Sequence, residues 1–165
     1  LTLTSGMYGI KTDYRHIVAD IKRLVEVYGL DVIGCGYDNH NANTFLADLE
    51  GILSCDLTEV KQSARTLNEA TQDFRLSVEA GKVRYDRRNA LLTWSMVNAV
   101  ISAPNSFGEI KIDKMTQTQR IDPCDAVIDA WAVWLSKRNE RKVDAQKALA
   151  AWLEITADVE RGDED

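Results

Sequence analysis

The stretch LDVIGCGYD, residues 30–38, decides the fold class. It is short, rich in apolar and β-branched residues, and bounded by turn-forming residues, as a strand buried inside an α/β fold would be. We therefore predict a strand over residues 30–37. Such a strand delivers Asp38 at its carboxyl end, where polar side chains of α/β sheets gather.

The segments on either side of this stretch predict helices and a parallel partner strand. Apolar residues between positions 12 and 28 recur with helical spacing, Thr12 or Asp13 can cap the helix, and Gly29 closes it. Residues 42–49 predict a second helix that Gly51 ends, and residues 56–60 predict another strand. A helix between two strands favours parallel pairing.

The second half of the chain continues to mix helices and strands. We predict a helix from a capping box at Thr66 and Glu69 to Gly81, a short strand at 82–85, a largely buried helix over 89–103, a half-exposed strand over 109–114, a long helix opened by Asp122 and Pro123, and a terminal helix beyond residue 136. The opening residues 1–4 alternate like a strand. No repeat or low-complexity tract interrupts the chain.

Composition indicates one globular domain without a membrane span. The chain has 165 residues, of which 45% are apolar and 28% charged, so disordered and collagen-like classes are excluded. Lys and Arg total 20 and Asp and Glu total 26, a net charge of −6, so any contact with a polyanion must come from local patches. No apolar run approaches the ~18–20 residues of a membrane helix, and no signal peptide is visible at the N-terminus. We expect a cytoplasmic protein.

The sequence lacks the residue patterns that several kinds of catalysis require. The three cysteines form no CxxC pair, which argues against a disulfide framework and a zinc site. The chain has no G-x-S-x-G motif and only two histidines, so a nucleophilic triad is not expected. A phosphate-cradling G-x-x-x-x-G-K-[ST] loop is also missing, so this chain should not hydrolyse ATP by itself.

Carboxylates in remote segments suggest a metal site. Asp38 follows the predicted buried strand, whereas Asp122 begins a helix after an alternating strand, and the edge of an α/β sheet can bring such segments together. Asp125 and Asp129 follow Asp122 at i+3 and i+7, on the same side of the helix. Converging carboxylates repel one another unless a cation lies between them, and Mg²⁺ and Mn²⁺ prefer oxygen ligands. Two such ions ~4 Å apart can support phosphodiester hydrolysis.

Each acid also has a purely structural interpretation. Asp122, Pro123 and Asp125 match the ordinary start of a helix, where the helix dipole favours acids. Asp38 can equally cap the helix that follows it, and Asp129 can be a solvated flank position. Spacing alone leaves these alternatives open.

Basic residues gather locally. One group surrounds a predicted turn and consists of Lys82, Arg84, Arg87 and Arg88. A second group, Lys111, Lys114 and Arg120, precedes Asp122, and both groups could contact phosphates, although a solvated face is the simpler interpretation. His40 beside Asp38 is more simply an exposed loop residue, and the four tryptophans lie at helical core spacing.

Three segments together resemble a known family. They are GYDNHNA at 36–42, YDRRNALLTW at 85–94 followed by Asn98, and RIDPCDA at 120–126 preceded by Lys114. Their order resembles that of the large subunits of tailed-phage terminases, and the chain is similar to the C-terminal nuclease domain of that family. The opening LTLTSG, residues 1–6, resembles the family's strand that ends in a threonine-glycine turn.

The resemblance implies a fold, an activity and a site. The implied fold is an RNase H-like mixed sheet flanked by helices, over residues 1–136, with a C-terminal helix and acidic tail over 137–165. The implied activity is metal-dependent cleavage of concatemeric viral DNA during genome packaging in the host cytoplasm. Asp38 and Asp122 correspond to two of the family's three catalytic acids, Asp125 is a further candidate ligand for Mg²⁺ or Mn²⁺, and the candidate DNA contacts are Lys114, Arg120, Arg84, Arg87 and Arg88.

One departure from the family pattern matters for activity. The family's first acid lies on the opening strand of the sheet, but residues 1–12 contain no Asp or Glu. We expect the chain to begin after that strand and after the upstream ATPase domain of the same polypeptide. On that expectation the metal site is incomplete, cleavage is weak, and the sheet has an unpaired edge.

Two other functions remain open. The chain could be a non-catalytic module that docks on the portal or small terminase subunit through its sheet edge and tail. It could also be an unrelated α/β domain that shares only cap-like aspartates. Metal binding lost on substitution of Asp122 favours the nuclease, whereas separated Asp38 and Asp122 favour the unrelated domain.

Overall fold

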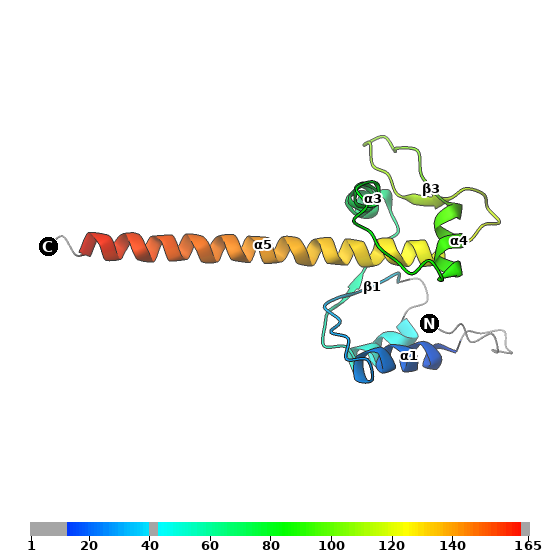
Figure 1. Cartoon of the computed structure of the whole chain (residues 1–165), viewed down its shortest axis with the longest axis horizontal. Coiled ribbons are helices and arrows are strands. Elements are labelled where there is room, and N and C mark those ends of the chain that lie inside the picture. The colour runs from blue at the N-terminus through cyan, green and yellow to red at the C-terminus, as the bar shows by residue number, and fades with distance from the viewer. Residues whose placement is uncertain (1–12, 40–42, 163–165) are drawn as a thin grey trace. The chain divides into compact units, whose positions relative to one another are not determined.

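The computed structural model describes residues 13–39 and 43–162, which contain helices interspersed with short strands (Figure 1). The elements are α1 (Tyr14–Glu26), β1 (Cys35–Tyr37), α2 (Asn43–Glu50), β2 (Leu57–Glu59), α3 (Ala64–Glu79), α4 (Ala90–Asn98), β3 (Ala99–Ile101), β4 (Ile112–Lys114) and α5 (Asp122–Gly162). The α/β class predicted from the sequence is confirmed. The helices of the described residues lack the combination of length and apolarity that crossing a membrane requires.

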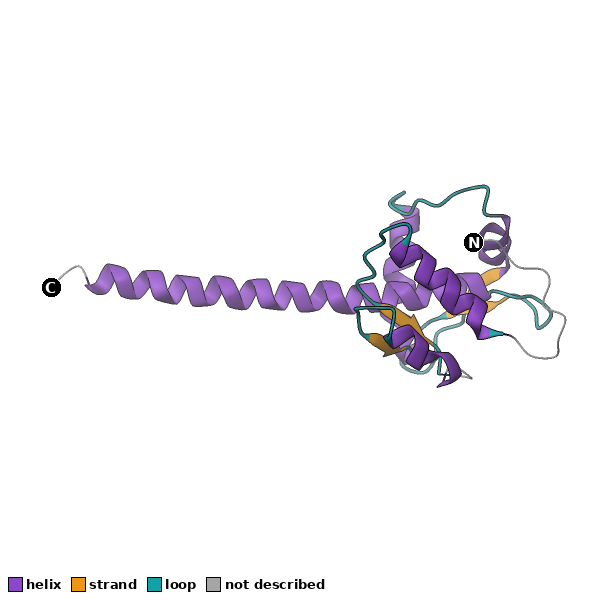
Figure 2. Ribbon diagram, turned by 90° about the horizontal axis from the view of Figure 1, so that it is seen from below, coloured by secondary structure: helices purple, strands orange, loops and turns teal. Residues whose placement is uncertain are grey.

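The strands of the described residues form two separate ladders rather than the single mixed sheet expected from the sequence (Figure 2). In the first, β1 pairs with β2 in parallel, with Cys35 opposite Leu57, which confirms the predicted pairing. In the second, β3 pairs with β4 antiparallel, with Ile101 opposite Ile112. Each strand has only three paired residues. The predicted strands 30–37 and 109–114 are shorter in the structure, where they span Cys35–Tyr37 and Ile112–Lys114. Leu30 and Ile33, which precede the first of these strands, are half exposed.

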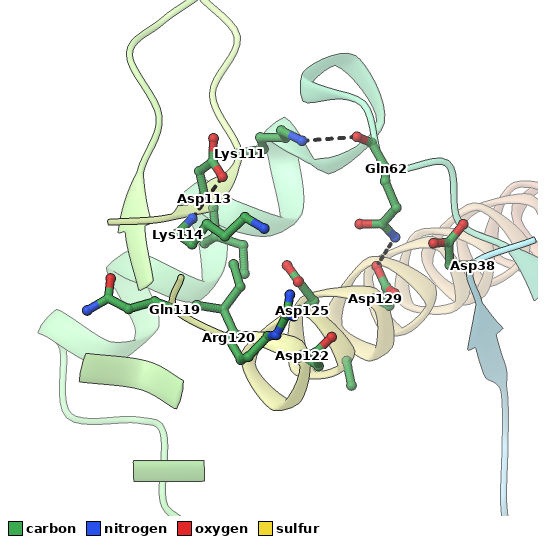
Figure 3. A pocket seen from close by; sticks show the side chains of 13 residues that line it. Asp38, Gln62, Lys111, Asp113, Lys114, Gln119, Arg120, Asp122, Asp125 and Asp129 are labelled. Carbon is green, nitrogen blue, oxygen red and sulfur yellow. Dashed lines mark hydrogen bonds between the residues drawn. The ribbon is translucent and has the colours of Figure 1, made fainter. Parts of the chain in front are cut away.

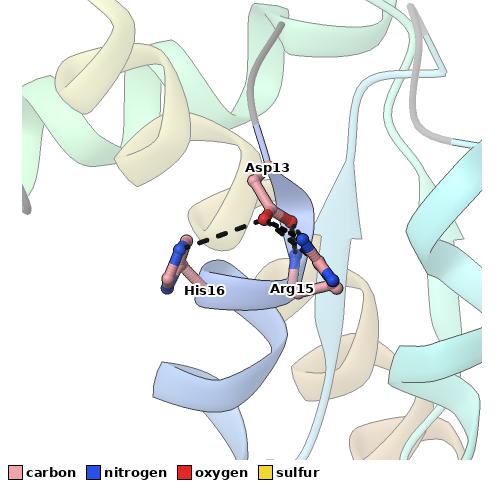
Figure 4. A network of polar contacts seen from close by, with 3 residues as sticks. All are labelled: Asp13, Arg15 and His16. Atoms are coloured by element: carbon pink, nitrogen blue, oxygen red, sulfur yellow. Dashed lines mark hydrogen bonds and ion pairs between the residues drawn. The ribbon is translucent and has the colours of Figure 1, made fainter. Parts of the chain in front are cut away.

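The first helix forms with one of the predicted caps, and the second forms over the predicted segment. The Asp13 side chain caps α1 by accepting a hydrogen bond from the Arg15 backbone N–H at 3.0 Å. Its carboxylate also pairs with the Arg15 guanidinium, and His16 lies 4.0 Å away (Figure 4). These contacts hold the pKa of Asp13 down at about 2. Tyr14 and Phe45 stack with ring centroids 4.9 Å apart, where α1 packs on α2.

Two expectations about α3 and the segment after it are wrong. Ser63 rather than Thr66 is the N-cap of α3, since its hydroxyl accepts from the Thr66 backbone N–H at 3.2 Å, so the helix begins three residues earlier than a capping box at Thr66 requires. Residues 82–85 form a loop instead of a strand. The short alternating pattern there has no partner strand to pair with among the described residues.

The predicted helix over 89–103 is also wrong in its extent and burial. It ends at Asn98, because the β-branched residues that follow pair as β3 with β4. It is not largely buried, since Trp94 is 47% and Val97 71% exposed; its buried residues are Ser95 and Asn98. Trp134 is likewise 39% exposed, so core packing does not account for all the tryptophans. The predicted opening strand at 1–4 and His40 lie outside the described residues.

The chain divides into two compact units, residues 1–133 and 134–165, with the boundary inside α5. The first unit contains a core built from α2, α3, β4 and the first turns of α5; its most completely buried apolar side chains are Leu49, Leu67, Ala70, Cys124 and Ile128. Phe74 and Trp131 meet edge to face at 5.1 Å, and the Trp131 indole N–H donates to Asp73 at 2.9 Å. In the second unit the Arg138 guanidinium lies 4.6 Å from the centre of the Trp134 ring. The predicted terminal helix beyond residue 136 is confirmed as part of α5.

Candidate active site

An open pocket of about 410 Å³ in the first unit collects charged side chains from three remote segments (Figure 3). Its acidic lining residues are Asp38, Asp113, Asp122, Asp125 and Asp129, and its basic lining residues are Lys111, Lys114 and Arg120. Figure 3 shows the basic side chains on one side, Asp38 and Asp129 on the other, and Asp122 and Asp125 between them. We call these five carboxylates the acid cluster.

Asp38 reaches the pocket because β1 packs closely on α5. A Cβ built on Gly36 would lie 3.0 Å from a Val133 methyl and 3.2 Å from the Asp129 backbone carbonyl. The lack of a side chain at Gly36 therefore permits the approach of strand and helix. Since Asp38 follows β1 directly, its carboxylate enters the pocket that Asp129 lines from α5.

The start of α5 is fixed by a neighbouring helix. The hydroxyl of Ser95, on α4, accepts a hydrogen bond from the Cys124 backbone N–H at 2.8 Å, and the Ile121 carbonyl accepts from Cys124 and Asp125 at 2.8 and 2.9 Å. The structural interpretation of the sequence made Asp122 the residue that caps this helix. In the structure the Ser95 hydroxyl accepts the capping hydrogen bond. The carboxylate of Asp122 instead lines the pocket.

Replacing Ser95 with Ala tests this cap. The buried N–H of Cys124 would keep only its bond to Ile121, so we expect the free energy of unfolding to fall by about 1 kcal/mol. Urea unfolding followed by circular dichroism measures the change. Ser106→Ala, at an exposed loop position, is the matched control and should leave the midpoint unchanged. Equal stability of the two variants would contradict the cap.

Burial and mutual repulsion raise the pKa of two carboxylates in the acid cluster. The pKa of Asp125 rises to about 6, chiefly through burial and then through the charges of Asp129 and Asp122, while Lys111 opposes the rise. The pKa of Asp129 is also raised by burial and by Asp38, against a hydrogen bond from Gln62. The charge of Asp38 thus acts on Asp129, and the charges of Asp129, Asp122 and Asp113 act on Asp125, so all five acids of the cluster take part in these shifts.

This electrostatic arrangement makes stability depend on pH. Because Asp125 binds its proton more tightly in the folded state than in the unfolded state, its contribution to stability is complete below about pH 4 and is lost as pH rises through 6. In the presence of chelator, the free energy of unfolding of Asp125→Asn should exceed that of wild type by about 1 kcal/mol at pH 7.5, a figure reduced for partial solvent exposure. Near pH 4 the two proteins should be equally stable. Urea titrations at both pH values measure this. A stability difference that is the same at both pH values would contradict the raised pKa of Asp125.

The acid cluster suits a hard divalent cation in its chemistry but does not form a closed cage. Among residues 13–39 and 43–162, no three Asp, Glu, His or Cys side chains form a group that could hold a metal ion alone. Asp122 and Asp129 are spaced about 10 Å along the helix axis, which spreads the acids. All donors in the cluster are carboxylate oxygens, and Mg²⁺ is commonly held by one or two carboxylates with waters and substrate phosphates. The donors therefore fit Mg²⁺ or Mn²⁺ with part of the shell left to water or phosphate.

The pocket contains some of the residues singled out in the sequence and adds others. Asp38, Asp122, Asp125, Lys114 and Arg120 all line it. Arg84, Arg87 and Arg88 are not among its lining residues; the Arg88 side chain is 90% exposed and pairs with Asp86 at 2.9 Å. Sequence reasoning missed Asp113 and Gln62. It placed Asp129 by its i+7 spacing on the same side of the helix as Asp122 and Asp125, with a solvated flank position as the alternative, and the structure places it in the pocket. Nothing local in the sequence marked Gln62.

Comparison with known proteins gives one match. The chain matches the family model described as "Terminase large subunit, endonuclease domain" over residues 3–140. The searches of curated proteins and of solved structures gave no match.

Proposed function

Because the chain belongs to the family of terminase large subunit endonuclease domains, we propose that its charged pocket is a metal-dependent nuclease site that cleaves viral DNA during packaging. The observation that carries this proposal is the meeting of carboxylates from β1, β4 and α5 with three cationic side chains in one pocket. The family itself is one of DNA-packaging endonuclease modules.

We assign roles to the residues by their chemistry. Asp38 and Asp122 are the proposed catalytic acids, and with Asp125 they are the proposed ligands of Mg²⁺ or Mn²⁺. A divalent cation bound there would activate water and stabilise the leaving oxygen of a phosphodiester. Lys114 and Arg120, on the basic side, would hold the DNA backbone, because each neutralised phosphate contributes to sequence-independent affinity. Arg84, Arg87 and Arg88 would act as outlying backbone contacts.

The wider setting of the proposal follows from the family. The proposed substrate is double-stranded viral DNA, and the proposed partners are an ATPase domain of the same polypeptide, the small terminase subunit and the portal, in the host cytoplasm. The parallel β1–β2 pair that ends at Asp38, with Asp122 opening α5, supports an RNase H-like arrangement of the first unit. The interaction-module alternative predicts DNA-independent binding to portal without any metal requirement.

Calorimetric titration with Mn²⁺ tests the proposed site without depending on turnover. We expect binding at pH 7.5 that competes with Mg²⁺ and that also raises the thermal midpoint. Nicking of supercoiled plasmid in Mn²⁺ measures the activity. Absence of Mn²⁺ binding together with unchanged DNA affinity in Asp122→Asn would contradict the nuclease and favour the interaction module.

A further inference from the structure

The backbone of Lys111 is fixed at the edge of the pocket. Lys111 directly precedes β4, and its backbone N–H donates to the Ser102 hydroxyl at 3.1 Å. Its carbonyl accepts from the Ser102 backbone N–H at 2.8 Å. These two bonds continue the β3–β4 pairing by one residue, so the start of the Lys111 side chain has a defined place.

The ammonium group of Lys111 is fixed as well. Its Nζ donates to the backbone carbonyl of Gln62 at 3.2 Å (Figure 3). Gln62 is itself held, because its side-chain Nε2 donates to Asp129 Oδ1 at 2.9 Å and to the Val60 carbonyl at 3.2 Å. Two segments remote from Lys111 along the chain thereby hold its head group at the pocket wall.

The acceptor of this bond is neutral, which leaves the charge of Lys111 available. No ion pair within 4 Å that joins described residues includes Lys111, although five carboxylates line the same pocket. The Gln62 carbonyl accepts from one of the three N–H groups of the Lys111 ammonium, so this bond does not use the other two. Among the described cations of this pocket, Lys111 is the one whose head group is held by a hydrogen bond.

We propose that Lys111 is a substrate contact whose ammonium binds a non-bridging oxygen of the DNA phosphate that enters the acid cluster. The inference rests on the proposed function and adds a residue to it. An anion can approach five carboxylates only where cations offset their charge, and Lys111 supplies one such charge in the same pocket. Because the head group is already ordered by Gln62, binding costs little side-chain entropy. Lysine binds phosphate as a point charge, which suits a single oxygen.

Salt-dependent DNA binding tests the proposal. Fluorescence anisotropy with a short labelled duplex, in Ca²⁺ and in chelator, gives Kd across about 50–200 mM KCl. Lys111→Gln should raise Kd about tenfold and lower the slope of log Kd against log salt by about 0.9, the loss of one phosphate contact. Lys111→Arg retains the charge and should recover most of the slope. A merely structural role would not be rescued in this way.

Lys61→Gln is the matched control, since Lys61 neighbours Gln62, is exposed, and does not line the pocket. It removes the same charge and should leave the slope nearly unchanged. If Lys111→Gln does not fold, the wild-type protein can be acetylated with and without duplex instead. Bound DNA should protect Lys111 from acetylation more than it protects Lys61. Equal protection of the two lysines overturns the proposal. If folded Lys111→Gln has the DNA affinity and the salt slope of wild type, this inference is overturned but the proposed function is not. Absence of DNA binding by wild type overturns the proposed function with it.

Discussion

Asp122→Asn is expected to weaken Mn²⁺ binding and to lower plasmid cleavage by at least about 100-fold, the loss typical of removing a direct contributor to a metal site. The substitution keeps the size of the side chain and the start of α5, because Ser95 and Ile121 hold the first turn. What it removes is an anionic oxygen from the pocket centre. Asp38→Asn should act similarly from the opposite wall.

The matched control for both variants is Asp31→Asn. Asp31 precedes β1, is exposed, and does not line the pocket. Its substitution therefore removes one carboxylate from the same segment and leaves the site intact. Calorimetry and plasmid nicking at pH 7.5 should give wild-type values for it. Equal metal affinity in Asp122→Asn and Asp31→Asn would contradict the assignment of the acid cluster as the metal site.

Gly36→Val is expected to lower the free energy of unfolding by about 3 kcal/mol, because it overpacks a close contact. Its first added carbon already meets methyl groups of Val133 and Val60 at 3.0 and 3.1 Å and the Asp129 carbonyl at 3.2 Å. The two further carbons of valine must displace β1 from α5. Thermal or urea unfolding by circular dichroism measures the effect.

Gly51→Ala is the control for this prediction. A Cβ at Gly51 meets only ordinary contacts, the nearest at 3.6 Å, so the midpoint should move little. The displacement caused by Gly36→Val also carries Asp38 away from Asp129, so the variant should bind Mn²⁺ more weakly even at temperatures where it remains folded. Full stability of Gly36→Val would show that β1 and α5 do not approach as described.

Local sequence signals predicted most helices but not their boundaries with strands. Capping and apolar spacing suffice for α1 and for the start of α5 at Asp122, since those signals lie within a few residues of each other. The end of α4 at Asn98 is different, because Ala99–Ile101 becomes a strand only by pairing with Ile112–Lys114. Such a tertiary partner is invisible to helical periodicity, and it overrides the helical preference of the apolar run.

The candidate site was predictable to the extent that its residues carry family motifs or helix periodicity. Asp38, Asp122 and Asp125 were found by position, and they line one pocket. Asp129 shares their helix face, but its burial depends on the close approach of β1 through Gly36. Gln62 and Lys111 gain their places from hydrogen bonds across 67 and 49 positions of sequence, for which no local pattern exists.

The packing of Gly36 on Asp129 and Val133 has a consequence for synthesis on the ribosome. Residues 34–38 are made well before the surface that holds them, which is the turn of α5 that ends near residue 133. Closing so long a loop is slow and entropically costly, so the pocket is assembled late. A nascent chain therefore possesses no assembled acid cluster until nearly all of its first unit has left the exit tunnel.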